Sequence, residues 1–370
     1  MTEKDTHYMA LALTEARKGL GRTSPNPAVG AVIVRDDVVV GCGYHHRAGE
    51  PHAEVNAILD AKGNTAGATI YVTLEPCNHS GKTPPCTQAI LDAGLDRVVI
   101  GLLDPNPHVL GGGKKFLQDK GLAVEAGVLE QECKALVYPF IKYSQTQLPW
   151  VILKAGLSLD GKITYAKGEG GTITGTESHD YVHQLRNQVD AILIGSNTAL
   201  IDNPSLTTRL HHSPQRDPLR VVLDSRLRIS PQANMLHQNS NADTVIFHAQ
   251  DTFAEKKDAL KQQGCRLVSV NRVPETGFLD LNSILTWLGR QNVVSVLVEG
   301  GAHVHGSFLN QELVDEINLF YAPFFIGPQG QGIVQGYGCH QLSAAERFSI
   351  TEVLPLGDDV LIKGIRPEHV

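Results

Sequence analysis

Four side chains in the first half of the sequence have the residue types and spacing of a catalytic metal site. His52 and Glu54 stand two residues apart in PHAEVNAI, at the start of an expected helix. Cys77 and Cys86 enclose the segment NHSGKTPP, which follows an expected strand and precedes a second helix. Zinc binds imidazole and thiolate ligands tetrahedrally, and three protein ligands leave a fourth place for water. We therefore predict a catalytic zinc site made by His52, Cys77 and Cys86.

Glu54 has the position of a proton carrier in such a site. Zinc lowers the pKa of a bound water to about 7, and a glutamate in an H-x-E sequence then moves the proton without binding the metal, as in zinc deaminases. We expect Glu54 to take this role. Eight residues separate the two cysteines here instead of two, so we expect the longer loop to contact the substrate. His79, in the same loop, is a candidate for either substrate contact or a fourth zinc ligand.

The alternatives for the cysteines are a disulfide or ordinary thiols. Six cysteines in 370 residues are too few for a disulfide scaffold, and a cytosolic chain keeps its thiols reduced. Taken alone, one histidine or one cysteine beside a helix is usually structural. The combination of H-A-E and P-C at strand-to-helix junctions favours the metal site.

The composition argues for a small soluble partner. The chain has 19% charged residues and a formal net charge of -7, so no basic face indicates nucleic-acid binding. The N-terminal segment has helical spacing without the apolar core of a signal peptide, and no run of about 18 apolar residues indicates a membrane span. We expect a cytoplasmic enzyme with a small-molecule substrate, no nucleic-acid or membrane partner, and a homo-oligomeric state.

The length and the pattern of elements predict two α/β domains, residues 1–146 and 147–370, divided near SQTQLP. The first should contain a strand pair turning at RDD, then helices and strands in alternation. The second should contain buried strands in AILIG, LRVVLDS, TVIFHA and VVSVLVEGG. Such runs favour a sheet of mostly parallel strands.

A glycine pair in the second half is a weak indication of a nucleotide site. No G-x-G-x-x-G follows its first strand. Glu299, Gly300 and Gly301 instead end an expected strand and precede a helical segment. Glycines let backbone amides approach a phosphate, and a helix N-terminus favours negative charge. By itself, such a turn is more often only a turn.

The first half resembles the family of bifunctional riboflavin-biosynthesis enzymes in SPNPAVGAVIV, GYHHRAGEPHAEVNAI, YVTLEPCNHSGKTPPCTQAI and GLLDPNP. The resemblance implies a cytidine-deaminase-like domain with one Zn²⁺, held by His52, Cys77 and Cys86, and with Glu54 as the catalytic residue. It also implies deamination of a diaminohydroxypyrimidine phosphoribosylamine. The residues at its substrate-contact positions are Asn26, His45, His79, Lys82, Asp104 and Asn106. Because the implied substrate carries a phosphate, we expect Lys82 to bind it, although each of these residues taken alone could equally be a solvated loop residue.

The second half resembles the reductase part of the same family in KAGLSLDGKI, HQLRNQVDAILIGSNTALIDNPSLTTR, VVLDS and VEGG. The resemblance implies a dihydrofolate-reductase-like domain in which NADPH lies across the C-terminal ends of the strands and reduces the ribosyl chain. The residues at its cofactor positions are Gly156, Thr172, Thr198, Asp202, Ser225, Gly301, Ala302, His303, Val304, His305, Gly306 and Ser307. Those at its substrate positions are Gly170, Arg186, Leu206, Arg209 and Glu299.

Roles for four side chains of the second half follow from their chemistry. Arg186 and Arg209 offer planar forks of donors that suit a phosphate. Lys154 and Asp202 are candidate proton donors, although Lys and Asp are also ordinary salt-bridge partners at strand ends. Thr172 departs from the family pattern, because the related S-x-W-I-T run has tryptophan there and serine in place of Gly170.

Two rival functions remain open from the sequence. A nucleic-acid deaminase shares H-A-E and P-C but has the short cysteine spacing and benefits from a basic surface. A regulatory protein with a degenerate reductase domain would explain Gly170 and Thr172. Ammonia release and NADPH oxidation on one substrate distinguish both from the bifunctional enzyme.

Overall fold

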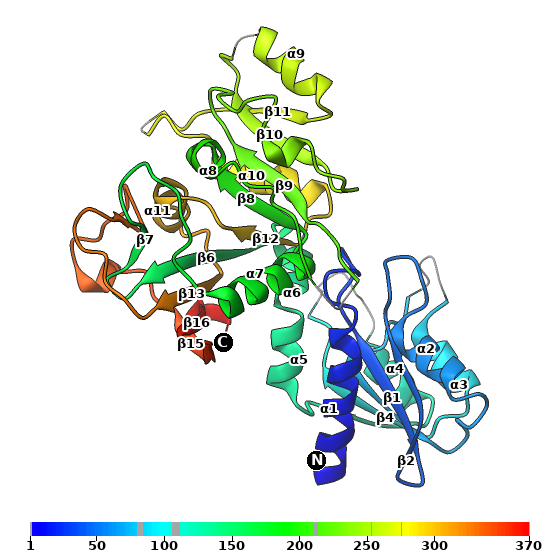
Figure 1. The fold of residues 1–370 in the computed structure, drawn as a ribbon. Helices are drawn as coiled ribbons and strands as arrows, with labels where there is room; N and C mark the ends of the chain where they lie inside the picture. The colour runs from blue at the N-terminus through cyan, green and yellow to red at the C-terminus, as the bar shows by residue number, and fades with distance from the viewer. Residues whose placement is uncertain are drawn as a thin grey trace. The chain divides into compact units, whose positions relative to one another are not determined.

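The computed structural model describes residues 2–79, 84–105, 112–210, 214–252, 254–274 and 276–369. The chain divides into two compact units, Met1–Gln147 and Leu148–Val370 (Figure 1). Among the described residues, no helix combines the length and the apolar character that crossing a bilayer requires.

The first unit is an α/β domain built on a five-stranded sheet in the order β2-β1-β3-β4-β5. β1 is antiparallel to both β2 and β3, whereas β3, β4 and β5 run parallel. Its elements are α1 (Glu3–Arg17), β1 (Gly30–Arg35), β2 (Val38–Tyr44), α2 (Ala53–Asp60), β3 (Thr69–Leu74), α3 (Cys86–Asp92), β4 (Arg97–Leu102), α4 (Gly113–Asp119), β5 (Ala123–Ala126), α5 (Glu130–Leu136) and α6 (Tyr138–Thr146).

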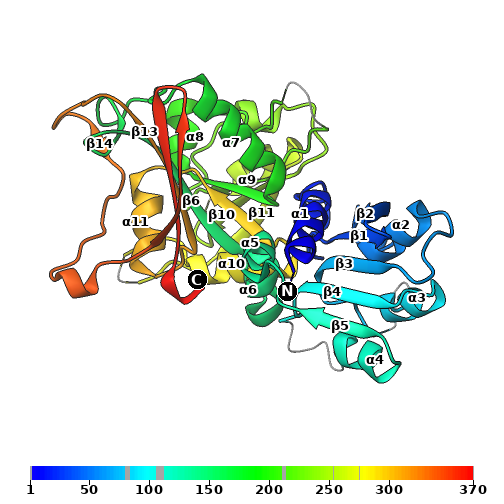
Figure 2. The same cartoon turned by 90° about the horizontal axis from the view of Figure 1, so that it is seen from below.

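The predicted RDD turn is confirmed. Asp36 and Asp37 connect β1 to β2 with φ angles of 50° and 62°, the positive values of a two-residue turn whose twist matches that of the strands. Helices cover both faces of the sheet, with α1 packed in one core and α2 and α3 in the other (Figure 2). A Cβ on Gly43 would lie 2.3 Å from the Ala57 backbone nitrogen, so glycine lets α2, which carries Glu54, lie directly on β2.

The second unit contains a nine-stranded sheet in the order β11-β10-β9-β8-β12-β6-β13-β16-β15 and a small β14-β7 pair. Its strands are β6 (Trp150–Ser158), β7 (Lys162–Thr164), β8 (Ala191–Gly195), β9 (Leu219–Leu223), β10 (Thr244–Ala249), β11 (Arg266–Val270), β12 (Ser295–Val298), β13 (Glu316–Ala322), β14 (Gln331–Gly332), β15 (Ser349–Leu356) and β16 (Asp359–Ile365). Its helices are α7 (Thr176–Gln188), α8 (Ser196–Asp202), α9 (Ala254–Gln262), α10 (Leu281–Arg290) and α11 (Ala302–Asn310), with 3-10 turns at Asn234–Leu236, Leu342–Ala344 and Pro367–His369.

The prediction of a mostly parallel sheet is confirmed for this unit. The strands from β11 to β13 in the sheet order all run parallel, and β8, β10 and β12 are buried along their whole length. The antiparallel hairpin of β15 and β16 at the β13 edge was not predicted. Parallel strands place their carboxyl ends along one edge, where α/β sheets bind ligands.

Candidate active sites

Two helix starts and one strand end bring the predicted zinc ligands together in the first unit. His52 is the residue before α2, with extended backbone, and Cys86 is the first residue of α3. Cys77 follows β3 by three residues. The His52 Nδ1 atom lies 3.6 Å from the Cys77 Sγ and 3.3 Å from the Cys86 Sγ. Residues from three elements therefore point their donor atoms at one place.

These donor atoms fit a zinc ion. All three lie within 4.8 Å of one another, and they form the only group of this kind among the described residues. The neighbouring thiols interact so closely that the pKa of Cys77 is lowered by Cys86, while that of Cys86 is raised. Thiolate and imidazole are preferred zinc ligands, and a three-ligand set suits a catalytic ion. His79 is exposed and lies outside this group, which argues against its being a fourth ligand.

Glu54 lies in the first turn of α2 and only 3% of its surface is exposed. Burial, together with the negative charge of Cys77, raises the pKa of Glu54 to about 7, although His52 opposes the shift. A carboxyl group with such a pKa both accepts and releases a proton near neutral pH. The position predicted for the proton carrier therefore has suitable electrostatics.

Asn26 and His45, two predicted substrate contacts, lie together beside the metal ligands. The Pro51 carbonyl accepts a hydrogen bond from His45 Nδ1 at 3.1 Å, so Nε2 is the acceptor for Asn26 Nδ2, also at 3.1 Å. Burial lowers the pKa of His45, and its ring lies edge-on to His52 at 5.1 Å. A neutral imidazole of fixed tautomer is thus held next to the site.

The other predicted contacts in this unit have different outcomes. Asp104 is half-buried just beyond β4, whereas Lys82 and Asn106 lie outside the described residues.

Sequence reasoning missed Glu75, whose carboxylate accepts hydrogen bonds from the backbone nitrogens of Asp104 at 3.1 Å and Lys114 at 2.8 Å. The sequence signal was an acidic residue directly before P-C. Glu75 ties the chain after β4 and the start of α4 to the strand that leads to Cys77.

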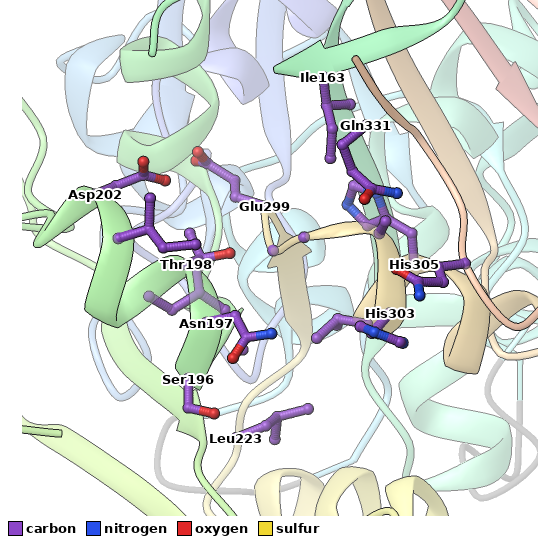
Figure 3. Close-up of a pocket in the computed structure, with 18 of the residues that line it drawn as sticks. Ile163, Ser196, Asn197, Thr198, Asp202, Leu223, Glu299, His303, His305 and Gln331 are labelled. Atoms are coloured by element: carbon purple, nitrogen blue, oxygen red, sulfur yellow. The ribbon is translucent and has the colours of Figure 1, made fainter. Parts of the chain in front are cut away.

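The second unit contains a pocket of about 810 Å³ at the carboxyl ends of its parallel strands (Figure 3). Most residues predicted for the reductase site line it. They are Lys154, Gly156, Thr172, Arg186, Thr198, Asp202, Leu206, Ser225, Glu299, Gly301, Ala302, His303, Val304, His305 and Ser307.

Gly170, Arg209 and Gly306 are not among the lining residues. A Cβ on Gly170 would lie 2.1 Å from Asp202 Oδ1, and one on Gly306 would lie 2.1 Å from the Gln335 carbonyl oxygen. The absence of a side chain at Gly170 and Gly306 therefore lets Asp202 and Gln335 pack closely against them. Arg209 is exposed, and its backbone nitrogen donates to His183 Nδ1 at 3.2 Å. Phosphate binding by Arg209 stays a prediction, because its exposed side chain is not among the residues that line the pocket.

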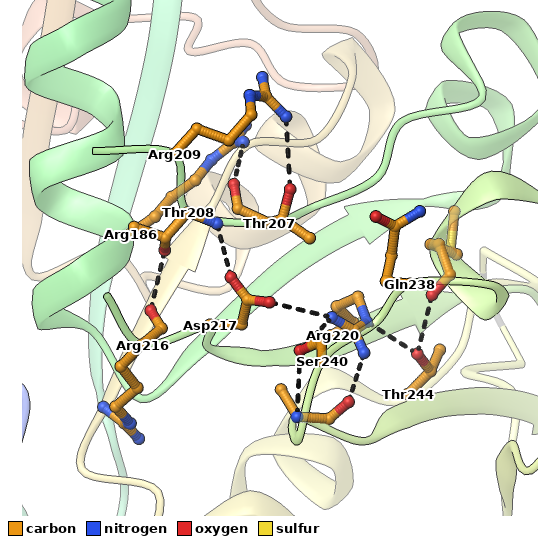
Figure 4. Close-up of polar contacts among 12 residues, drawn as sticks. Arg186, Thr207, Thr208, Arg209, Arg216, Asp217, Arg220, Gln238, Ser240 and Thr244 are labelled. Carbon is orange, nitrogen blue, oxygen red and sulfur yellow. Dashed lines mark hydrogen bonds and ion pairs between the residues drawn. The ribbon is translucent and has the colours of Figure 1, made fainter. Parts of the chain in front are cut away.

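Glu299 is held as a charged carboxylate by Arg186. The guanidinium donates two parallel hydrogen bonds of 2.8 Å to Glu299. It donates a third, of 3.1 Å, to the Thr207 carbonyl (Figure 4). Burial alone would raise the pKa of Glu299, but Arg186 and Lys154 outweigh burial and lower it to about 2. We predicted that Arg186 clamps a phosphate. The structure shows instead that its fork is occupied by a carboxylate.

The two candidate proton donors have pKa values shifted towards neutrality by burial. Lys154 Nζ lies 3.9 Å from Glu299 Oε2, and burial lowers the pKa of Lys154 although Glu299 opposes this. Burial likewise raises the pKa of Asp202. Each shift eases proton transfer near neutral pH, so both residues remain candidates.

The turn from β12 to α11 fits a dinucleotide. A Cβ on Gly300 would lie 2.7 Å from the Ile194 Cα, and Gly301 has a φ of 66°, so only glycine suits this turn beside β8. His305 Nδ1 donates to the Ile333 carbonyl at 3.1 Å, which makes Nε2 an acceptor. Nε2 is buried without a hydrogen-bond partner among the described residues, and burial lowers the pKa of His305 to about 4. A bound cofactor would supply the missing donor.

Comparison with known families assigns each unit. A model of the RibD C-terminal domain matches residues 149–362, more than half of the chain. A model of the cytidine and deoxycytidylate deaminase zinc-binding region matches residues 2–102. These matches identify the folds as reductase-type and deaminase-type domains.

Two relatives match nearly the whole chain, so the similarity spans both units. The riboflavin biosynthesis protein RibD of Bacillus amyloliquefaciens is 39% identical over 362 residues, covering 98% of this chain and 96% of the relative. RibD of Escherichia coli K12 is 39% identical over 371 residues, covering 97% and 98%.

Solved structures agree with these relatives. RibD of Acinetobacter baumannii superimposes with a TM-score of 0.86 at 33% identity, covering 98% of this chain and 99% of that one. A diaminohydroxyphosphoribosylaminopyrimidine deaminase/5-amino-6-(5-phosphoribosylamino)uracil reductase of Thermotoga maritima has the same TM-score and coverage at 36% identity.

Proposed function

Because the chain belongs to the family of RibD riboflavin-biosynthesis proteins, we propose that its first unit deaminates a phosphoribosylaminopyrimidine and its second unit reduces the product. The chain is a bifunctional deaminase and reductase of riboflavin biosynthesis that uses zinc and NADPH. The substrates that we assign to it are those named for the Thermotoga maritima relative. Which residues perform each step is inferred from the geometry of the two sites.

In the first unit, His52, Cys77 and Cys86 would hold zinc, which supplies an activated water for attack on the amino-bearing ring carbon. Glu54 accepts a proton from that water and delivers it to the leaving amine, so water and substrate give the oxo product and ammonia. Its burial and raised pKa support this role. Asn26 and the neutral His45 are placed to orient the pyrimidine edge.

In the second unit, the turn at Gly300 and Gly301 and the acceptor of His305 would hold NADPH, which supplies a hydride when bound. Reduction opens the ribosyl ring to a ribityl chain, and a proton must be delivered alongside the hydride. Lys154 and Asp202 are the proposed donors. Glu299 stays charged through its pair with Arg186, and so offers a fixed acceptor for substrate hydroxyl groups.

The observation that carries the proposal is the three-ligand cluster beside a buried glutamate. The test has two stages: ammonia release from the diamino substrate without nucleotide, then consumption of NADPH by the deaminated product. We expect both activities in one preparation. Ammonia release only from cytosine in an oligonucleotide would favour a nucleic-acid deaminase. Deamination without NADPH consumption would favour a degenerate reductase domain.

A cysteine variant tests whether the two units act separately. Cys86→Ser should abolish zinc binding and deamination. Reduction of the pre-deaminated substrate should continue, because none of the three predicted zinc ligands lines the pocket of the second unit. Cys339→Ser, an exposed cysteine of the second unit, is the matched control. Loss of both activities in a folded Cys86→Ser protein would contradict this division.

Several predictions rest on the sequence alone. These are phosphate binding by Lys82 and substrate contacts by Asn106 and His79, together with homo-oligomeric assembly and a cytoplasmic location. Lys82→Ala should raise the Michaelis constant for deamination by roughly ten- to hundredfold at low salt, while zinc content stays unchanged. Unchanged kinetics would make Lys82 an ordinary surface lysine.

A further inference from the structure

The pocket of the second unit has two separate groups of basic side chains. Lys154 and Arg186 surround Glu299 and belong to the proposed reaction site. Arg226, Arg228 and Arg272 also line the pocket, and no step of the proposed reaction uses them. A cavity with cationic groups in two places suits a ligand, or a pair of ligands, with two separate anionic groups.

The order of strands places the two groups of basic side chains on opposite sides of β8. Lys154 is on β6 and Glu299 follows β12, which pairs with β6. Arg226 and Arg228 follow β9, and Arg272 follows β11. β8 separates β12 from β9 in the sheet. In Figure 3, Ser196 and Leu223, at the ends of β8 and β9, lie across the cavity from Glu299.

Arg228 is oriented by hydrogen bonds to α8 and lies beside a buried aspartate. Its Nε lies 3.9 Å from Asp224 Oδ1, a buried oxygen that has no hydrogen-bond partner among the described residues. Its Nη2 donates to Ser196 Oγ at 2.5 Å and to Asn197 Oδ1 at 2.7 Å. The side chain remains 43% exposed. Arg228 is therefore oriented by the fold while part of its guanidinium stays accessible.

Arg272 is oriented by hydrogen bonds to two backbone carbonyl groups. Its Nη2 donates to the Ser225 carbonyl at 3.2 Å and its Nη1 to the Gly277 carbonyl at 2.9 Å. The nearest carboxylate, that of Asp251, is 3.5 Å away and 74% exposed. The Ser225 carbonyl thus joins Arg272 to the loop that carries Arg226 and Arg228.

These three arginines carry more positive charge than their carboxylate partners neutralise. Arg226 is exposed and forms no ion pair within the described part of the chain. Asp224 and Asp251 are the carboxylates paired with the other two arginines, which leaves a surplus of one positive charge. Guanidinium groups that line the same part of a cavity suit a phosphate, because their planar donors match phosphate oxygens.

We propose that Arg226, Arg228 and Arg272 bind the 2′-phosphate of NADPH and thereby select NADPH over NADH. The two nucleotides differ only in this phosphate, which is on the adenosine ribose at the far end from the reacting nicotinamide. The arginines likewise lie on the far side of the cavity from Glu299 and Lys154. This inference rests on the proposed reduction in the second unit, and it adds the residues that decide the cofactor.

Calorimetric titration of the full chain with NADPH and with NADH tests the inference without relying on turnover. The variants Arg226→Gln and Arg272→Gln avoid exposing the buried charge of Asp224, and Arg347→Gln, an exposed arginine outside the pocket, is the control. We expect each variant to weaken NADPH binding by about tenfold or more, with NADH affinity changed less than about twofold and the control unchanged. Wild type should also bind 2′-AMP more tightly than 5′-AMP.

The other outcomes separate the inference from the proposed function. Equal weakening of both nucleotides, or unchanged NADPH affinity in both variants, overturns the assignment of the 2′-phosphate. Weakened binding of the phosphoribosyl substrate with unchanged NADPH affinity would place the substrate phosphate here instead and also overturns it. Wild type that binds NADPH and NADH equally contradicts the inference alone. Wild type that binds neither contradicts the proposed reductase function itself.

Discussion

The two sites contain buried glutamates whose pKa values are shifted in opposite directions. Glu54 in the first unit has a pKa raised to about 7 by burial beside the Cys77 thiolate. Glu299 in the second unit is buried too, yet Arg186 and Lys154 lower its pKa to about 2. The same side chain, removed from water in both places, is therefore suited to carry a proton in one and to keep its charge in the other.

The difference lies in the neighbours that the fold supplies. Glu54 is close to thiols and one histidine, none of which forms a bidentate hydrogen bond with it, so the cost of desolvating its charge dominates. Glu299 receives two short hydrogen bonds from a guanidinium, and these compensate for the same cost. A buried carboxyl group indicates its chemical role only when its partners are known.

Replacement of Glu54 should have the largest effect. Glu54→Gln keeps the three zinc ligands but cannot carry a proton, so deamination should fall by about 10²- to 10⁴-fold while zinc content and NADPH-dependent reduction remain. Metal analysis and ammonia release measure this. Glu132→Gln, an exposed glutamate of the same unit, is the control. Near-normal ammonia release would show that Glu54 is not the proton carrier.

Replacement of Glu299 should mainly affect the stability of the second unit. Glu299→Gln leaves the buried Arg186 without its counter-ion, which should lower the free energy of unfolding at neutral pH by about 3 kcal/mol. Both tryptophans, Trp150 and Trp287, lie in this unit, so their fluorescence in urea reports its unfolding. Glu352→Gln is the control, because its pair with Lys363 is at the surface and worth at most about 1 kcal/mol.

The stability difference between wild type and Glu299→Gln should also depend on pH. The pKa of Glu299 in the folded chain is below its ordinary value, so its contribution is fully present above about pH 4.5 and is lost as the pH falls through 2. The pKa shift corresponds to about 3 kcal/mol of folding free energy. A difference that stays constant through this acid range would mean that Glu299 is not held charged by the fold.

Loss of the amide that contacts His45 should have a smaller effect, confined to the first unit. Asn26→Ala removes the donor to His45 Nε2, and we expect the Michaelis constant for deamination to rise by up to about tenfold. Reduction should be unaffected. Asn64→Ala, an exposed asparagine beyond α2, is the control, and equal effects in both variants would argue against a role of Asn26 at the site.

The smallest expected effect concerns Gly170. An alanine Cβ there would lie 2.1 Å from Asp202 Oδ1, so Asp202 must rotate, and NADPH affinity should fall by about three- to fivefold. Gly338→Ala, where a Cβ meets nothing within 4 Å, is the control. Unchanged NADPH binding in Gly170→Ala would mean that the position of Asp202 does not matter to the cofactor.

Local patterns in the sequence were sufficient for much of the fold and for the zinc site. Strand alternation and turn residues gave the β1–β2 hairpin and the buried strands of the second unit, because they depend on neighbours in the chain. The hairpin of β15 and β16 was missed. β15 is largely exposed, so it lacks the continuous apolar run by which the other strands of this unit were recognised.

The sequence by itself determined the types of ligand, the order of the two halves and the residues of the glycine turn, since these are written in short segments. Only the tertiary structure decided the electrostatics. Arg186 and Glu299 are separated by 113 positions, and no local pattern shows that they meet. Nor does a local pattern show that Arg186 lowers the pKa of Glu299 while burial raises that of Glu54. Charge depends on burial and on contacts between distant segments, and only the folded chain defines both.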